Sequence, residues 1–221
     1  PHFLVMTATP IPRTLALTLY GDLDVSILDE KPPGRTPILT KWVRSSEKMK
    51  VYRWVFQKIE EGNQAYVVAP LIEKSEKLEA EAAIELHKNL EALAPQGIKV
   101  GLIHGRMKRD ERREVMQRFR DREFQILVAT TVIEVGIDVP TATIMVIEHA
   151  ERFGLAQLHQ LRGRVGRGKE RSYCILITKG RVTEETRMRL EALVKSNDGF
   201  EIAEVDLKIR GPGQVFGTCL L

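Results

Sequence analysis

One short apolar run decides the fold that this sequence predicts, and it ends in two hydroxyl side chains: Gln125-Ile126-Leu127-Val128-Ala129-Thr130-Thr131. Apolar residues that follow one another without polar alternation are typical of a strand buried on both faces of a sheet. Comparable runs occur at residues 64–69 and 143–148. Segments with the apolar periodicity of amphipathic helices lie around these runs. Buried strands that alternate with helices predict an α/β fold, with a parallel sheet covered by helices on both faces.

The alternation continues from residue 38 to residue 178, which we interpret as one domain. Its elements are short enough to be ordinary strands and helices of a parallel α/β sheet. The expected strands are 38–43, 64–69, 98–103, 125–129, 143–148 and 172–178, and the expected helices are 47–61, 77–93, 108–122 and 155–161.

The segments on either side of this domain have a different composition. Residues 31–37 contain three prolines and one glycine, which predict a stiff linker that separates residues 1–30 from the domain. After the domain, residues 179–221 begin with two charged amphipathic segments, 183–195 and 201–209. These predict a helical hairpin that leads into a Gly/Pro loop and has no core of its own.

Composition limits the class of protein. Of the 221 residues, 43% are hydrophobic, which is ample for a packed core. The net charge of +4 is a mild basic excess, compatible with a phosphate-bearing partner but not diagnostic of one. The two cysteines, Cys174 and Cys219, have no metal-ligand spacing, so we expect no metal site and a reducing, cytoplasmic compartment. No run of 18 apolar residues occurs, so we expect no membrane span.

Three arginines lie within six residues, Arg162, Arg164 and Arg167, separated by small residues that leave guanidinium groups free to approach a ligand. The planar guanidinium matches phosphate oxygens with two parallel hydrogen bonds. At a helix end, Arg164 and Arg167 would share one face because they are three residues apart. The cluster favours a phosphate ligand, and the alternative is a solvated basic turn.

This stretch resembles motif VI of the superfamily 2 helicases, with matches at Gln160, Gly163, Arg164, Gly166 and Arg167. The resemblance implies that Arg164 and Arg167 are catalytic and reach the γ-phosphate of ATP, with Gln160 and Gly163 near the nucleotide. It also implies that the sheet is RecA-like and that ATP and Mg²⁺ are held mainly by another RecA-like domain. An arginine supplied in this way accelerates phosphoryl transfer about 10³–10⁵-fold.

Residues 128–140 resemble motif V of the same superfamily. The resemblance implies that Thr130 and Thr131 lie near the DNA backbone, and that Gly136 and Asp138 lie near the nucleotide. Hydroxyls and free amides after the carboxyl end of a strand are well placed to hold phosphate. The alternative is an ordinary loop after a strand.

Two further turns resemble helicase motifs. Thr7-Ala8-Thr9 resembles motif III, which implies that residues 1–30 are the end of a first RecA-like domain and that Thr7 and Thr9 couple nucleotide to DNA. His104-Gly105 resembles the turn that contacts the tracking strand, and a structural turn is the alternative. The helix expected after it carries charges of both signs, so we expect a solvated face laced by weak ion pairs rather than a DNA contact.

Residues 6–15 narrow the resemblance to the duplex-translocating RecG and Mfd families, and residues 21–35 and 206–213 favour the RecG family. This implies an ATP-dependent DNA helicase and duplex translocase that acts in branch migration and fork reversal during recombination and repair. Residues 179–221 would be a translocation hairpin like that of these families, with Arg210, Gly211 and Gly213 in coupling. An Mfd-like transcription-repair translocase and a non-catalytic nucleic-acid-binding module are the alternatives.

The sequence contains no Gly-x-x-x-x-Gly-Lys-[Ser/Thr] loop and no Asp-Glu-x-His segment, so this chain alone should not hydrolyse ATP. The resemblance implies several partners: branched or forked DNA, an N-terminal wedge domain, the first RecA-like domain and single-stranded DNA-binding protein. The chain begins at Pro1, and we expect it to be part of a longer protein. It departs from the family after Thr218, where it ends in Cys219-Leu220-Leu221, which puts the coupling loop in doubt.

Overall fold

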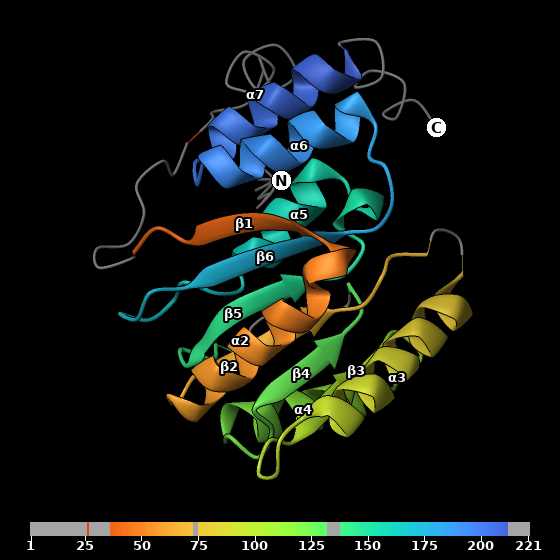
Figure 1. Ribbon diagram of the computed structural model, residues 1–221, viewed down its shortest axis with the longest axis vertical. Coiled ribbons are helices and arrows are strands. Elements are labelled where there is room, and N and C mark those ends of the chain that lie inside the picture. The colour runs from red at the N-terminus through yellow and green to blue at the C-terminus, as the bar shows by residue number, and fades with distance from the viewer. Residues whose placement is uncertain (1–25, 27–35, 73–74, 132–137, 212–221) are drawn as a thin grey trace, which may run out of the picture.

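The computed structural model describes residues 26, 36–72, 75–131 and 138–211 (Figure 1). Their strands form one parallel sheet in the order β1-β6-β5-β2-β4-β3. The strands are β1 (Leu39–Arg44), β2 (Gln64–Val68), β3 (Val100–Ile103), β4 (Ile126–Ala129), β5 (Ala142–Ile147) and β6 (Tyr173–Thr178). The parallel α/β sheet expected from the sequence is therefore confirmed.

Helices cover both faces of the sheet. Helices α2 (Lys48–Glu60) and α3 (Glu76–Leu93) pack on one face, and α4 (Arg109–Arg120) and α5 (Leu155–Arg162) pack on the other. Within β2 the side chains alternate between the two cores: Tyr66 and Val68 face α4 and α5. All five residues of β2 are buried, as expected for a central parallel strand.

Helices α6 (Glu184–Lys195) and α7 (Gly199–Arg210) form the expected hairpin, which lies beyond β1 in Figure 1. Thr183 and Asp198 cap the two helices through side-chain oxygens that accept backbone N–H bonds. The hairpin packs on α5 and on the edge strand β1, and its apolar side chains join the core of the α4–α5 face. It extends the α/β domain and has no separate core.

Several sequence-based boundaries lie outside the described residues, including almost all of residues 1–30 and most of the linker at 31–37. The helix expected at 47–61 begins one residue later, because residues 45–47 form a single 3-10 turn before α2. None of the described helices combines the length and apolar composition that a bilayer crossing requires.

Candidate functional site

Two arginines of the cluster, the half-buried Arg164 and the exposed Arg167, lie in a turn, residues 163–168, which we call the arginine turn. Helix α5 ends at Arg162, so the expectation that Arg164 and Arg167 share a helix face is wrong. The chain reverses at Gly166, whose φ is +79°, and a Cβ atom there would lie 2.9 Å from Ile38. A glycine is needed because the backbone conformation is left-handed and the neighbour is close.

The arginine turn lies at the amino edge of the sheet, beside the residues that lead into β1, β5 and β6. The backbone N–H of Gly166 donates to the Ser172 hydroxyl over 3.0 Å. A Cβ atom on Gly168 would lie 2.9 Å from the carbonyl oxygen of Pro140. The turn therefore packs directly against the segment that carries Asp138, and Nη1 of Arg167 lies 3.5 Å from Oδ1 of that carboxylate.

The arginine turn concentrates positive charge on one side of the sheet. Burial, and then the charge of Arg167, lowers the pKa of the half-buried Arg164. Burial raises the pKa of Tyr66 to about 12, and both arginines act on that phenol in the opposite direction. Among the described residues no carboxylate pairs with Arg164. Two neighbouring guanidinium groups, of which only that of Arg167 pairs with a carboxylate among the described residues, can bind an anion with several oxygens, such as a phosphate chain.

The third arginine of the cluster behaves differently. Arg162 is only 1% exposed, and its guanidinium donates hydrogen bonds to neighbouring elements. The expectation that all three guanidinium groups are free to approach a ligand is therefore wrong for Arg162, because it lies inside the protein. Sequence spacing could not separate it from Arg164, which is two residues away.

At the opposite, carboxyl edge of the sheet, the ends of β3 and β4 bring His104 and Thr130 together. The backbone N–H of Thr130 donates to the carbonyl of Ile103 over 3.2 Å. The Thr130 hydroxyl and Nδ1 of His104 are buried and find no hydrogen-bond partner within the described parts of the chain. Burial, and then the charge of Arg106, lowers the pKa of His104. Buried polar atoms are normally paired, so these two are candidates to meet a ligand.

The structure thus divides the motif at 128–140 between two edges of the sheet. Thr130 is buried and Thr131 is half-buried at the carboxyl edge, beside His104 and Gly105. Asp138 is exposed at the amino edge, where the chain leads into β5 and meets Arg167. Residues expected to meet DNA are therefore separated from those expected to meet the nucleotide.

The remaining candidates are spread over other parts of the chain. Gln160 and Gly163 are exposed at the end of α5, next to the arginine turn. Arg210 ends α7, where its guanidinium pairs with Asp206, and Gly211 follows with a φ of +74°. Thr7, Thr9, Gly136 and Gly213 lie outside the described residues.

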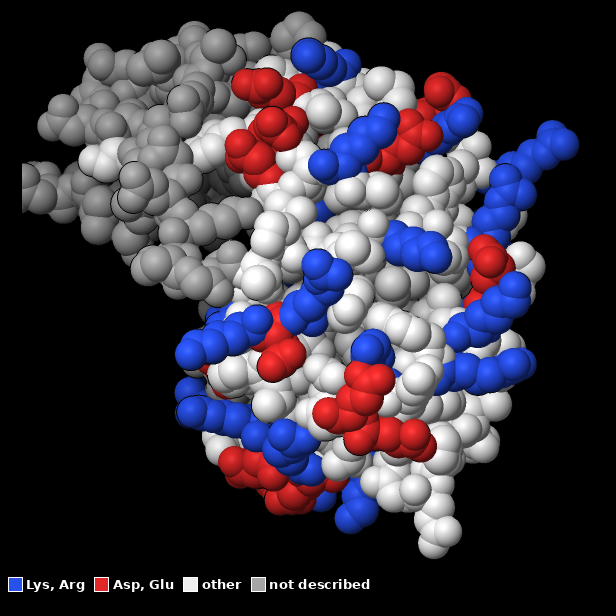
Figure 2. All heavy atoms as spheres, turned by 60° about the vertical axis from the view of Figure 1, so that its left-hand side comes forward, with Lys and Arg blue, Asp and Glu red and all other residues white. Residues whose placement is uncertain are grey.

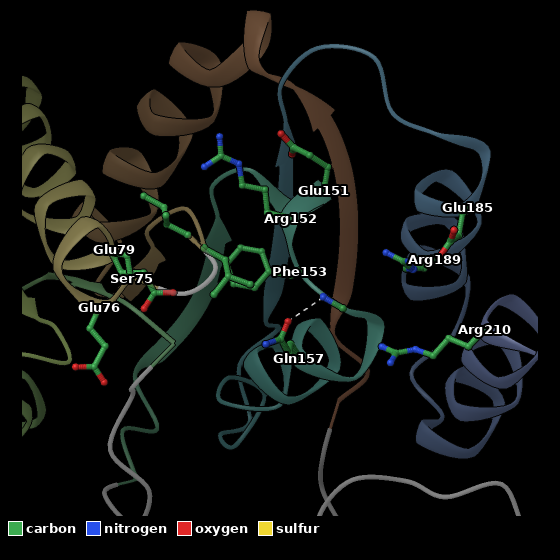
Figure 3. A pocket seen from close by; sticks show the side chains of 13 residues that line it. Ser75, Glu76, Glu79, Glu151, Arg152, Phe153, Gln157, Glu185, Arg189 and Arg210 are labelled. Carbon is green, nitrogen blue, oxygen red and sulfur yellow. Dashed lines mark hydrogen bonds and ion pairs between the residues drawn. The ribbon is translucent and has the colours of Figure 1, made fainter. Parts of the chain in front are cut away.

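Sequence reasoning missed a cavity of about 1220 Å³ between the start of α3, the residues before α5 and the hairpin (Figure 3). Three arginines line it, Arg152, Arg189 and Arg210, together with several glutamates. Arg189 pairs with Glu185 across one turn of α6. These arginines come from three separate elements, so no local motif could have revealed the cavity.

Helix α4 has the solvated character expected from its sequence. Arg118 pairs with Glu123 over 2.8 Å, and the Glu111 carboxylate accepts the backbone N–H of Lys108 over 2.8 Å. Figure 2 shows Lys and Arg side chains interspersed with Asp and Glu side chains over the described surface of the face that it draws. Surface pairs of this kind contribute little to stability, and α4 gives no reason to assign it to DNA.

Comparisons with known proteins agree with this geometry. Residues 27–169 match the helicase conserved C-terminal domain. The chain is 54% identical to the ATP-dependent DNA helicase RecG of Synechocystis sp. over 218 residues, 99% of the chain and 26% of that relative. It is also 54% identical to RecG of Escherichia coli K12 over 219 residues, 99% of the chain and 32% of that relative. The chain therefore spans only about a quarter to a third of these relatives.

A solved structure of RecG bound to a three-way DNA junction superposes with a TM-score of 0.78, at 50% sequence identity, over 94% of this chain and 27% of that one. The yeast protein Dbp5, bound to RNA and ADP BeF3, has a TM-score of 0.51 at 18% identity over 90% of this chain and 46% of that one, which shows a shared fold alone. The RecA-like sheet with a helical hairpin is thus confirmed. The chain belongs to the helicase conserved C-terminal domain family.

Proposed function

We propose that this chain is the second motor half of an ATP-dependent DNA helicase that translocates on branched or forked duplex DNA. Branch migration and fork reversal in recombination and repair are the processes that such a motor serves. The observation that carries the proposal is the arginine turn, where Arg164 and Arg167 lie together. Among the described residues Asp138 pairs with Arg167, and no carboxylate pairs with Arg164. The similarity to RecG helicases, one of them bound to a three-way DNA junction, supports the choice of substrate.

In this proposal Arg164 and Arg167 act on ATP that a neighbouring RecA-like domain holds. Charge develops on the oxygens of the transferring phosphoryl group, and fixed guanidinium groups stabilise it most strongly in the transition state. The exposed Gln160, Gly163 and Asp138 would contact the nucleotide beside them. Gly136 belongs to the same proposed set by its sequence position.

The carboxyl edge would hold the DNA backbone. Thr130, Thr131, His104 and Gly105 present hydroxyl, imidazole and backbone groups at the ends of two adjacent strands. Such groups contact phosphate and sugar without reading base sequence. The unpaired Thr130 hydroxyl and His104 nitrogen would find their partners there.

The hairpin would couple closure of the motor to movement of the duplex, with Arg210, Gly211 and Gly213 in the coupling segment and Thr7 and Thr9 at the other end of the chain. We assign residues 1–30 to the end of the first RecA-like domain, 31–37 to the linker, 38–178 to the second RecA-like domain and 179–221 to the translocation element. The matching residues lie in this order along the chain.

ATP and Mg²⁺ are the proposed cofactors. The arginine turn fits the phosphates of ATP, because it offers guanidinium donors and positive charge. Within the described residues no three His, Cys, Asp or Glu side chains gather as a metal site, so we assign the Mg²⁺ ligands to the first RecA-like domain. That domain, an N-terminal wedge domain and single-stranded DNA-binding protein are the proposed protein partners, and the cytoplasm is the proposed location.

The test is to replace Arg164 or Arg167 with alanine in the full-length protein that carries this chain. We expect hydrolysis to fall about 10³-fold or more, because the developing phosphoryl charge loses its donor. Binding of a three-way DNA junction should stay within about twofold, because the DNA-facing groups lie at the other edge of the sheet. Arg118→Ala on α4 is the control that removes an exposed arginine elsewhere. Normal hydrolysis by either turn variant would contradict the proposal.

A further inference from the structure

Arg162 is the largest of the fully buried side chains in the described parts of the chain. Its Nη1 atom donates to the Leu193 carbonyl over 2.6 Å and to the Ser196 carbonyl over 2.8 Å. The same atom lies 3.2 Å from the Thr40 hydroxyl of β1, and Nη2 lies 3.1 Å from Nδ1 of His159. One side chain therefore joins α5, the edge strand and the end of α6.

These contacts are directional, which distinguishes Arg162 from an apolar core residue. A buried charge is costly unless hydrogen bonds replace its water, and burial lowers the pKa of this guanidinium. The carbonyls at the end of α6 offset that cost, because they carry the negative end of the helix dipole and have no partner within the helix. Leu193 and Ser196 lie at this end, so the contact fixes the hairpin where α6 turns into α7.

The backbone of Arg162 also forms part of the last turn of α5, to which the arginine turn is hydrogen-bonded. The backbone N–H of Val165 donates to the carbonyl of Arg162 over 3.2 Å, and that of Arg164 donates to Leu161 over 3.0 Å. The position of Arg164 thus depends on the last turn of α5. Arg162 therefore connects the end of α6, through its side chain, to the start of the arginine turn, through its backbone carbonyl.

A second contact joins the hairpin to the middle of the turn, at Gly166. The Asn197 side chain, between α6 and α7, accepts the backbone N–H of Ile38 over 3.2 Å and donates to its carbonyl over 3.1 Å. Gly166 packs directly on Ile38. The start and the middle of the turn are therefore connected to residues 196–197, at the point where the hairpin reverses.

We propose that Arg162 is a positioning residue that makes the location of Arg164 depend on the location of the hairpin. When DNA moves the hairpin, Arg162 would transmit the movement to the arginine turn. When nucleotide binds at the turn, Arg162 would transmit that change to the hairpin. This inference rests on the proposed function, because it assigns the residue that links two of its parts. The physical basis is that the end of α5 packs against both the hairpin and the arginine turn, so a ligand at either site can shift its position.

The test compares Arg162→Lys with Gln64→Met in the full-length protein. Lysine keeps the charge but offers one flexible ammonium group instead of a planar fork, so it cannot hold all the partners at once. Gln64 is the matched control, because it is fully buried and its amide donates to two carbonyls, Phe119 and Phe124, over 2.7 Å each. Its loss weakens the end of α4 and leaves the hairpin untouched.

Four quantities are measured: kcat for ATP with and without a three-way DNA junction, the KM for ATP, and the Kd for the junction. For Arg162→Lys we expect the stimulation of kcat by DNA to fall about tenfold, a typical size for coupling between sites. The DNA-free kcat, the KM and the Kd should each change less than about twofold, because the arginine turn bonds to the backbone carbonyls of Leu161 and Arg162, which lysine keeps, and both ligand sites stay intact. In Gln64→Met, DNA should stimulate kcat as strongly as in the wild type, even when its Tm falls as much as that of Arg162→Lys.

Equal loss of stimulation in both variants would overturn the inference, because Arg162 would then act only through stability. A wild-type protein without ATPase activity would instead contradict the proposed function itself, and the inference with it. If Arg162→Lys does not fold, the inference is tested by amide hydrogen exchange of the wild-type protein with and without DNA. DNA binding should change protection at the amides of Arg164 and Val165 together with those at the end of α6, and unchanged protection at the turn would overturn the inference.

Discussion

The two edges of the sheet hold their candidate residues in different ways. At the carboxyl edge, Thr130 and His104 are neutral polar groups fixed by adjacent strands, with buried atoms that lack partners within the described residues. At the amino edge, Arg164 and Arg167 are charged and belong to a turn, in which Arg164 is half-buried and Arg167 is exposed. Strands of four to six residues separate the edges by about 13–20 Å, at about 3.3 Å per residue. A rigid sheet can therefore serve two ligands without mixing their chemistry.

Among the variants that test the separation of the two edges, we expect Gly168→Val to have the largest effect on activity. Its side chain would collide with the Pro140 carbonyl and push the arginine turn away from Asp138. Displacement of a catalytic group by about 1 Å can cost about 100-fold in rate, so we expect kcat for ATP to fall by that order. Junction affinity, set at the other edge, should be retained. Steady-state ATPase assays and fluorescence anisotropy measure the two quantities.

Gly97→Ala is the control for strain alone. Gly97 has a φ of +95° and no atom within 4 Å of an added Cβ, so the substitution strains a loop far from both candidate sites. It should lower the stability by about 1 kcal/mol and leave kcat unchanged. If Gly168→Val lost junction affinity as strongly as it lost kcat, the separation of the two edges would be refuted.

A smaller effect is expected at the carboxyl edge from Thr130→Val, which removes one hydroxyl without changing the shape. If this hydroxyl meets a phosphate, the Kd for the junction should rise about tenfold, the size of one hydrogen bond to a charged group. The KM for ATP should not change. Thr143→Val is the matched control, because the Thr143 hydroxyl is buried at the amino end of β5 and donates to Asn63 over 2.7 Å. An equal change in Kd for both variants would argue against the DNA assignment.

The smallest expected effect is the dependence of stability on pH. It should come from His104 at the carboxyl edge and not from the arginines. The pKa of His104 is lowered by burial and by Arg106, so the unfolded chain binds the proton first as the pH falls below about 6.5. Stability contributed by neutral His104 is therefore lost between about pH 6.5 and its lower folded-state pKa. Urea unfolding at pH 7.5 and 5.5 should show a smaller acid loss in His104→Gln. An identical loss in both proteins would show that His104 does not contribute.

The sequence predicted the elements well and their arrangement poorly. Buried runs such as residues 125–129 identified every strand of the described sheet to within two residues at each end, because period and composition are local properties. The strand order was not predicted, since it depends on where each crossover returns. The placement of Asp138 at the amino edge, away from Thr130, follows instead from the parallel direction of the strands, because the chain leaves β4 at the carboxyl edge and enters β5 at the amino edge.

By itself, the sequence determined the parallel α/β domain, the hairpin and the residue types that can hold phosphate, because apolar periodicity and guanidinium chemistry are carried by the chain. Only the tertiary structure decided which arginine of the cluster is buried and which remains accessible. Arg162 and Arg164 are the same residue type two positions apart, yet the guanidinium of Arg162 is enclosed by α6 and β1, whereas Arg164 is only half-buried. The physical reason is that burial and hydrogen-bond partners come from segments distant in sequence, here residues 40 and 193–196.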